Sequence, residues 1–504
     1  MNIQSFLEHH GINRNPFAEE DAQTDQVFKE FCISSAYHPI WDKVYGDPSE
    51  PSTSIIFGPK GSGKTAMRLQ IDQHLGRYND EHPGQRLFVI RYDDFNPFLD
   101  HFCERLGRRL SRKPEKVLDA WRLWDHMDSI LCLGVTDLID RILNADQGIP
   151  AESVSKQRVH DLDRTYARDL LLLASSYDQS TASTFIGRWN ELRRALGYRN
   201  FTSKLSLITA ITAAILSVLL VVLLYWGDWS SGDGDEAGKT SRLTLLLIPV
   251  MTLIGSAPWL WRTAKCHVAA MGIRRHMRVG KRETGSLRKI LQQFPTKELV
   301  NQPLPRYDRT DDRYELLNKF KAILGRLGFS GIIVLMDRVD EPHMTGGKPE
   351  LMRRFTWPLL DNKLLKHPGV GFKIMLPQEL QRDIDRETRE FHERARLDKQ
   401  NVIPAFQWTG ESLYDLARAR MLACAAPGSS PEPKDLFSQE VSYERMLAAF
   451  QSLSVPRHLF RFLFRVQVEH CNRHTDAQPV YRISGEIFES TLAVYARESE
   501  LSHY

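Results

Sequence analysis

The sequence predicts an α/β fold, in which helices cover both faces of a parallel sheet, with a helical insertion and a helical C-terminal lid. Short apolar segments separated by helical stretches are the pattern of such a sheet. They occur at residues 53–58, 86–92, 331–336, 371–377 and 402–406. A glycine-rich loop follows the first segment, and two long apolar runs lie between the second and the third.

Length, charge and cysteine content indicate which classes of protein the chain can belong to. The chain has 504 residues, so several units are expected rather than one core. The net charge of +4 gives no indication of nucleic-acid binding. The 6 cysteines are dispersed, without a C-x-x-C pair, which excludes a zinc or disulfide framework and fits a reducing compartment. The N-terminus has no signal-peptide pattern, so any membrane insertion would be directed by an internal segment.

The glycine-rich loop carries the clearest chemical signal. Residues 58–65 read GPKGSGKT, the complete phosphate-binding pattern G-x-x-x-x-G-K-[ST]. Its glycines let backbone N–H groups face a phosphate, Lys64 brings positive charge to the β and γ phosphates, and the Thr65 hydroxyl can bind magnesium. Helical spacing after Thr65 adds a helix N-terminus. We therefore expect ATP and Mg²⁺ to be bound by Gly58, Pro59, Lys60, Gly61, Ser62, Gly63, Lys64 and Thr65.

A partner motif follows the third apolar segment, where residues 331–342 read GIIVLMDRVDEP. Asp337 ends the predicted strand and can hold the magnesium water shell beside Thr65. Asp340 or Glu341 can orient or deprotonate the attacking water, and Glu341 is the preferred candidate. A buried strand followed by an acidic turn would look the same if it stood alone, so the assignment depends on pairing with the glycine-rich loop.

Two acids, Asp93 and Asp94, follow the second apolar segment. They could approach the metal, but solvated turn acids are the commoner explanation for such a pair. We do not include them in the predicted site.

The two apolar runs predict a transmembrane hairpin between these motifs. Residues 205–226 contain no charge, proline or glycine, and as a helix they would span about 33 Å, enough to cross a hydrocarbon core of roughly 30 Å. Residues 243–261 are also uncharged but contain Pro249, Gly255 and Pro258, which makes them the weaker span. The alternative is a pair of buried core helices in a water-soluble protein.

Basic flanks predict the orientation of this hairpin. Cationic side chains lie on both outer sides, at Arg193, Arg194, Arg199, Lys204, Arg262, Lys265, Arg274, Arg275, Arg278, Lys281 and Arg282. The connecting loop has four acids against two bases, namely Asp228, Asp233, Asp235 and Glu236 against Lys239 and Arg242. Because Lys and Arg favour the cytoplasmic side, we expect a multi-pass protein of the inner (cytoplasmic) membrane, with both termini and the nucleotide-binding domain cytoplasmic. The cationic flanks also suit anionic lipid headgroups.

These features resemble the KAP family of P-loop NTPases, in which transmembrane helices are inserted into the ATPase domain between the two motifs. The segment DRVDE at residues 337–341 is similar to the D-x-h-D-E signature of the wider STAND branch of signalling NTPases. Arg338 stands where KAP members often have a second acid, so the chain resembles a divergent relative.

Two weaker similarities concern the ends of the chain. The segment SVPR at residues 454–457 resembles a sensor-2 motif, which implies that Arg457 reaches the γ-phosphate from a lid; a solvent-facing helix start is the alternative. Asn15-Pro16-Phe17 resembles the segment near the adenine in AAA-like ATPases, and an ordinary turn is the alternative. A finger acting on a neighbouring subunit could come from Arg382, Arg386, Arg389, Arg394 or Arg396.

The resemblance implies an ATPase that works as a nucleotide-driven conformational switch in bacterial signalling or antiphage defence, as a homo-oligomer with a protein trigger. One alternative is an ATP-driven transport or translocation motor, which the uncharged spans disfavour. The other is a membrane scaffold that binds nucleotide without hydrolysis, which intact Lys64, Thr65, Asp337 and Glu341 disfavour.

The expected organisation follows from these assignments. We predict a leader at 1–50, the first part of the nucleotide-binding core at 51–112, a helical stalk at 113–203, the hairpin at 204–262, a return stalk at 263–325, the second part of the core at 326–410 and the lid at 411–504.

Overall fold

The computed structural model describes residues 1–34, 36–107, 110–144, 154–182, 184–199, 202–230 and 237–501. The chain forms two compact units. Unit 1 consists of Met1–Asn96, Pro114–Trp121 and Gly328–Tyr504, and unit 2 of Pro97–Lys113 and Arg122–Leu327. The glycine-rich loop and the acidic motif after residue 336 therefore belong to one unit, although all of unit 2 separates them in sequence.

Unit 1 is built on a parallel sheet of five strands in the order β2-β3-β4-β1-β5. The strands are β1 (Ser54–Gly58), β2 (Arg86–Tyr92), β3 (Phe329–Met336), β4 (Val370–Pro377) and β5 (Asn401–Ile403). All five predicted segments are strands, and the α/β prediction is confirmed. The arrangement is consistent with a Rossmann-like or P-loop fold, with β4 between the strands that precede the two motifs.

The strands follow from their sequences. β1 and β4 are almost entirely buried, as expected for apolar, β-branched segments covered on both faces. β5 ends at Ile403, short of the predicted residue 406, because Pro404 has no backbone N–H for the ladder.

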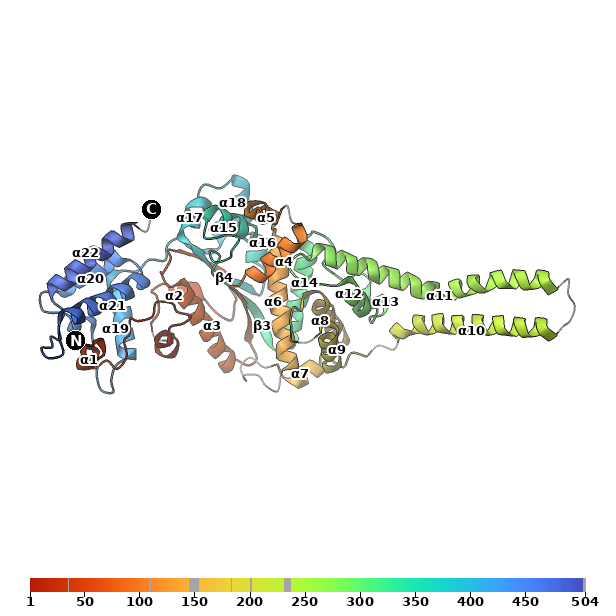
Figure 1. Cartoon of the computed structure of the whole chain (residues 1–504), viewed down its shortest axis with the longest axis horizontal. Coiled ribbons are helices and arrows are strands. Elements are labelled where there is room, and N and C mark those ends of the chain that lie inside the picture. The colour runs from red at the N-terminus through yellow and green to blue at the C-terminus, as the bar shows by residue number, and fades with distance from the viewer. Residues whose placement is uncertain are drawn as a thin grey trace. The chain divides into compact units, whose positions relative to one another are not determined.

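Helices surround this sheet in unit 1 (Figure 1). The N-terminal part contains α1 (Ile3–His9), the π-helical turn η1 (Phe28–Cys32), α2 (Trp41–Tyr45) and α3 (Lys64–Glu81). Later segments add α5 (Pro114–Ala120), α15 (Pro349–Thr356), α16 (Asn362–Leu365), α17 (Gln378–Ile384) and α18 (Arg389–Ala395), with short 3₁₀ turns at Trp357–Leu359, Leu397–Lys399 and Pro433–Leu436.

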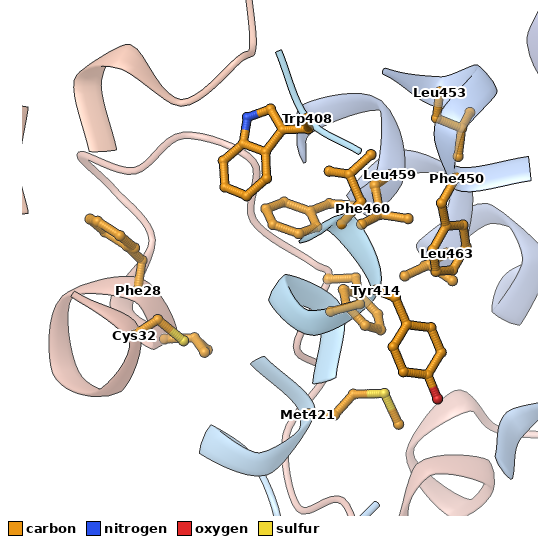
Figure 2. Close-up of a cluster of buried hydrophobic side chains, with 14 of the residues drawn as sticks. Phe28, Cys32, Trp408, Tyr414, Met421, Phe450, Leu453, Leu459, Phe460 and Leu463 are labelled. Carbon is orange, nitrogen blue, oxygen red and sulfur yellow. The ribbon is translucent and has the colours of Figure 1, made fainter. Parts of the chain in front are cut away.

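The C-terminal helices are α19 (Gly410–Ala423), α20 (Tyr443–Leu453), α21 (Pro456–Arg473) and α22 (Gly485–Leu501). Thr409 and Ser442 cap α19 and α20 through their hydroxyls, and Pro456 opens α21, where its missing N–H costs nothing. These helices share a hydrophobic core with the N-terminal segment, part of which is drawn in Figure 2. The leader therefore packs on the C-terminal helices as well as on the sheet.

Unit 2 is helical. It contains most of α4 (Asn96–Leu106), α6 (Leu123–Leu143), α7 (Lys156–His160), α8 (Arg164–Tyr177), α9 (Phe185–Ala195), α10 (Thr202–Ser230), α11 (Ala237–His276), α12 (Thr284–Leu291), α13 (Thr296–Leu299) and α14 (Thr310–Arg326). Buried ion pairs join these helices. Arg313 contacts Asp128 at 3.0 Å with both side chains fully buried, and Arg188 contacts Asp178 at 2.7 Å.

The two predicted spans fall within α10 and α11, which run alongside one another (Figure 1). Gly255 allows a close approach, because a Cβ there would lie 2.4 Å from the Cβ of Ala213. Across the described residues, no helix combines the length and apolar character needed to cross a membrane. Most side chains of residues 243–254 lie outside that description, and so do residues 231–236, which include Asp233, Asp235 and Glu236 of the predicted loop.

Candidate nucleotide-binding site

The glycine-rich loop connects β1 to α3, as predicted. Gly61 and Gly63 adopt φ values of 85° and 95°, a left-handed region that favours glycine. A Cβ at Gly61 would also lie 2.8 Å from the Cβ of Arg457, so the loop could not pack there with a larger residue. The Ser62 hydroxyl is buried and makes no hydrogen bond within the described structure. The loop thus has the strained, tightly packed backbone that a phosphate cradle requires.

Lys64 lies inside this loop. Its Nζ donates hydrogen bonds to the carbonyl oxygens of Gly58, at 2.7 Å, and Pro59, at 3.0 Å. Burial lowers the pKa of Lys64, and the nearby carboxylates of Asp337 and Asp340 oppose that effect. A bound polyanion would favour the charged form of this lysine still further.

Thr65 and Asp337 meet, although 272 positions separate them in sequence. The Thr65 hydroxyl donates a hydrogen bond of 2.8 Å to Oδ2 of Asp337. Asp337 is 2% exposed, and burial raises the pKa of its carboxyl, against the opposing effects of the Thr65 hydrogen bond and the charge of Arg68. The structure therefore brings together the two side chains that the sequence assigns to the metal.

These two oxygens fit Mg²⁺, which commonly takes one or two protein ligands and completes its octahedron with phosphate oxygens and water. Within the described part of the chain, no group of three or more His, Cys, Asp or Glu side chains could hold a metal by itself. A magnesium ion at Thr65 and Asp337 would therefore depend on the nucleotide for further ligands.

Arg68 was missed by the sequence analysis. This buried side chain places Nε at 3.5 Å from Oδ2 of Asp337 and Nη1 at 2.9 Å from Oδ2 of Asp93. Asp93 is thus connected to the candidate metal site through an arginine, whereas Asp94 accepts a hydrogen bond from the Asn96 backbone as an exposed turn acid. The sequence did contain a signal for this residue. Arg68 follows Lys64 by one helical turn, so the two side chains lie on the same face of α3.

Asp340 and Glu341 line the same cavity as Lys64 and Thr65. The Glu341 side chain is 55% exposed, and its Oε1 lies 3.3 Å from Nε of Arg338. Burial raises the pKa of Glu341, while the positive charge of Arg338 lowers it. Arg338 is therefore an ion-pair partner of Glu341, the preferred candidate for the residue that deprotonates the attacking water.

Arg457 lies against the glycine-rich loop at the start of α21. Its backbone N–H donates to the Gly61 carbonyl at 3.3 Å, and its Nε lies 3.9 Å from Oε2 of Glu20. Glu20 also binds Arg461, with 2.5 Å between Oε1 and Nε. Arg457 therefore lies beside the phosphate loop, and its contact with a γ-phosphate stays a prediction. The lining of the described cavity includes none of the candidate finger arginines at 382, 386, 389, 394 and 396.

The cavity beside the loop has a volume of about 480 Å³ and two chemically different ends. Charged groups surround the phosphate loop, while aromatic and apolar groups form the other end. His38 stacks on Phe406 with ring centroids 4.1 Å apart, and Trp408 donates from Nε1 to the Ser62 carbonyl at 2.8 Å. Figure 2 shows Phe28 and Cys32 facing Trp408 and Phe460; all four line the cavity.

Phe17 packs behind Phe460, one of the aromatic residues that line the cavity. It is buried, and its ring centroid is 6.1 Å from that of Phe460. The Pro16 carbonyl accepts a 2.7 Å hydrogen bond from Nε of Arg420, which lines the cavity. The predicted Asn15-Pro16-Phe17 segment therefore supports the apolar end of the cavity without lining it.

Comparisons of the chain with protein-family models, with curated proteins and with solved structures gave no match.

Proposed function

We propose that this chain is a magnesium-dependent ATPase that works as a nucleotide-driven switch. The observation that carries the proposal is the hydrogen bond between Thr65 and Asp337, because it joins the glycine-rich loop to the acidic motif at one end of a parallel sheet. Ligands of α/β sheets bind at the carboxyl ends of the strands, which is where both motifs lie.

The two ends of the cavity fit the two ends of a nucleotide. The purine would lie among Phe28, His38, Trp408 and Phe460, whose rings and apolar surfaces suit an aromatic base. The triphosphate would then extend to the backbone N–H groups of residues 58–65 and to Lys64. The observed volume of about 480 Å³ is within the range of ligand sites.

Each charged residue has a defined role in this proposal. Thr65 and Asp337 would hold Mg²⁺, which when bound neutralises phosphate charge. Glu341 would accept a proton from the water that attacks the γ-phosphorus, as the bond from that phosphorus to the bridging oxygen breaks. Lys64 and Arg457 would stabilise the charge that moves onto the phosphate oxygens.

The switch would operate through Arg457. This residue contacts Gly61 of the phosphate loop and begins α21 of the C-terminal helices, so a γ-phosphate would compete with Glu20 for its guanidinium. Movement of Arg457 toward the phosphate would shift α21, which packs against α19, α20 and α22. We further propose that α10 and α11 anchor the chain in the cytoplasmic membrane, for which the uncharged run 205–226 is the support.

Turnover measurements test the site. We expect Lys64→Ala and Glu341→Gln to reduce ATP hydrolysis by at least about 100-fold, since each removes a group that acts on the transition state. Glu341→Gln should still bind ATP, because it keeps Lys64, Thr65 and Asp337. The matched controls are Lys366→Ala and Glu350→Gln, which change exposed side chains of the same kinds outside the cavity.

Unchanged hydrolysis in both Lys64→Ala and Glu341→Gln would overturn the assignment of the site. Binding of ATP without any hydrolysis by the wild-type protein would favour the scaffold alternative instead.

A further inference from the structure

A second, larger cavity lies in unit 2. Its volume is about 1980 Å³, and it is formed by the second half of α11 together with α12, α13 and the segment from Val300 to Tyr307. Thr209 of α10 and Pro258 of α11 also line it, so the cavity extends to the base of the apolar helix pair. We call it the basic groove.

The lining of the basic groove is strongly cationic. Asp312 is the single carboxylate among its described lining residues, and Arg306 lines it beside Gly272 of α11. The other basic lining residues are Arg105, Arg262, Lys265, Arg274, Arg275 and Lys297. Such an excess of one sign raises the local concentration of anions and favours an anionic ligand.

Arg306 supplies a positive charge that the surrounding structure holds in place. Its Cβ would be 3.3 Å from a Cβ at Gly272, so the absence of a side chain on α11 creates the space for it. Its Nε is buried and has no hydrogen-bond partner in the described structure. Burial lowers the pKa of this guanidinium. A half-buried cation with an unused, buried donor is stabilised when an anion reaches it.

The same groove exposes apolar side chains. Trp261 and Val268 of α11 are 67% and 63% exposed, and Met271 and Val300 are also exposed. Along α11, the helical spacing places Trp261, Lys265, Val268, Gly272 and Arg275 on one face. Cationic and apolar groups therefore alternate along the same wall, which suits a ligand that is itself both anionic and apolar.

We propose that the basic groove binds an anionic membrane phospholipid. Its headgroup phosphate would pair with Arg306 and Lys265, and an acyl chain would cover Val268, Met271 and Trp261. Free phosphate would leave these apolar side chains in water. A nucleic acid would need several stacking aromatic surfaces, whereas aliphatic side chains predominate here. This proposal does not depend on ATP hydrolysis, because the groove lies in unit 2 and the nucleotide site in unit 1.

Native mass spectrometry of the full chain tests this proposal. The protein in a non-ionic detergent is mixed with phosphatidylglycerol or with phosphatidylcholine of the same acyl chains. We expect phosphatidylglycerol to remain bound and phosphatidylcholine to dissociate. The double variant Lys265→Gln/Arg306→Gln should bind phosphatidylglycerol about 30-fold more weakly, from the usual contribution of each basic residue near anionic lipid.

Two further variants test whether binding depends on the position of the charges and on the apolar side chains of the groove. Lys289→Gln/Arg194→Gln removes the same charge from unit 2 outside the groove and should bind as the wild type does. Val268→Gln keeps every cation but makes the apolar wall of the groove more polar, and it should also bind phosphatidylglycerol more weakly. ATP hydrolysis by each variant reports whether unit 1 is intact.

Equal retention of the two lipids would overturn the proposal. So would unchanged phosphatidylglycerol binding in Lys265→Gln/Arg306→Gln or in Val268→Gln. A short oligonucleotide that competes fully with phosphatidylglycerol would also overturn it, in favour of a general polyanion surface. In each of these cases, ATP hydrolysis that still depends on Lys64 would leave the proposed ATPase function standing.

Discussion

Arg338 adjoins two residues of the candidate site. It directly follows Asp337, adopts φ 64° in the left-handed region, and places its guanidinium beside Glu341. Non-glycine residues in this region are uncommon and are found where the surrounding structure enforces them. The turn after β3 therefore points Arg338 toward Glu341, the proposed catalytic base.

The pH dependence of Arg338→Gln tests this role. Arg338 lowers the pKa of Glu341, so its removal raises that pKa further above the ordinary value. If Glu341 accepts a proton, activity requires its carboxylate form. We therefore expect the acid limb of the kcat/KM profile to move to higher pH in Arg338→Gln, with activity at alkaline pH less affected. An acid limb at the wild-type position would show that the pair does not control the titrating group.

At the scale of elements, α21 connects the phosphate loop to the C-terminal helices. It carries two arginines, Arg457 and Arg461, of which the second can serve as a control for mutation of the first. Arg457 and Arg461 both bind Glu20, but the lining of the nucleotide cavity includes Arg457 and not Arg461, which is 53% exposed. We expect Arg457→Ala to weaken ATP binding by roughly 10-fold or more, the usual effect of losing a charged hydrogen bond. Arg461→Ala should have little effect. Calorimetric titration with a non-hydrolysable ATP analogue measures both.

Strand β4 buries a lysine at the centre of the sheet. Lys373 is 2% exposed, lies 3.4 Å from the Ser54 hydroxyl, and has its pKa lowered to about 8 by burial. An unfolded lysine titrates near 10.4, so the unfolded state binds more protons between these values and the stability of the wild type rises with pH there. Below pH 8 the cost of burying the charge is fully present.

We therefore expect Lys373→Met to increase the free energy of unfolding at pH 7 by roughly 1–3 kcal/mol. This gain should shrink as the pH rises toward 10. Thermal unfolding across that range measures the effect, with the exposed Lys366→Met as the control. A destabilised Lys373→Met at pH 7 would show that the hydroxyls of Ser54 and Ser52, at 3.4 and 3.5 Å from Nζ, offset the burial of the charge.

The sequence predicted the strands well because each is a short apolar run with a clear end. The position of the glycine-rich loop between β1 and α3 was equally predictable, because its eight residues are adjacent in sequence. The apolar end of the nucleotide cavity was not, because η1, α21 and the segment between β5 and α19 each contribute only one or a few side chains to it. Arg68 was also missed: its position one turn after Lys64 indicates the face of α3 on which it lies, but not that it is buried between Asp93 and Asp337.

At the scale of the whole molecule, unit 2 lies between the two motifs in sequence, and α10 and α11 lie within it. The nucleotide site consists of residues of unit 1 alone. Because the core residues of unit 1 come from both sides of this insertion, its fold should not require the tip of the helix pair. Nucleotide binding and membrane attachment are therefore expected to be separable.

Replacement of residues 207–257 by a short Gly/Ser linker tests this separation. The change removes the uncharged run and the contact of Gly255 with Ala213, but keeps the buried residues Ala270 and Ile273 of α11. We expect the wild type to stay with membranes after an alkaline carbonate wash and the shortened chain to be released without detergent. The shortened chain should still bind ATP. Release of the wild type by the wash would argue against a spanning hairpin, whereas loss of ATP binding by a folded shortened chain would show that the helix pair supports the site in unit 1.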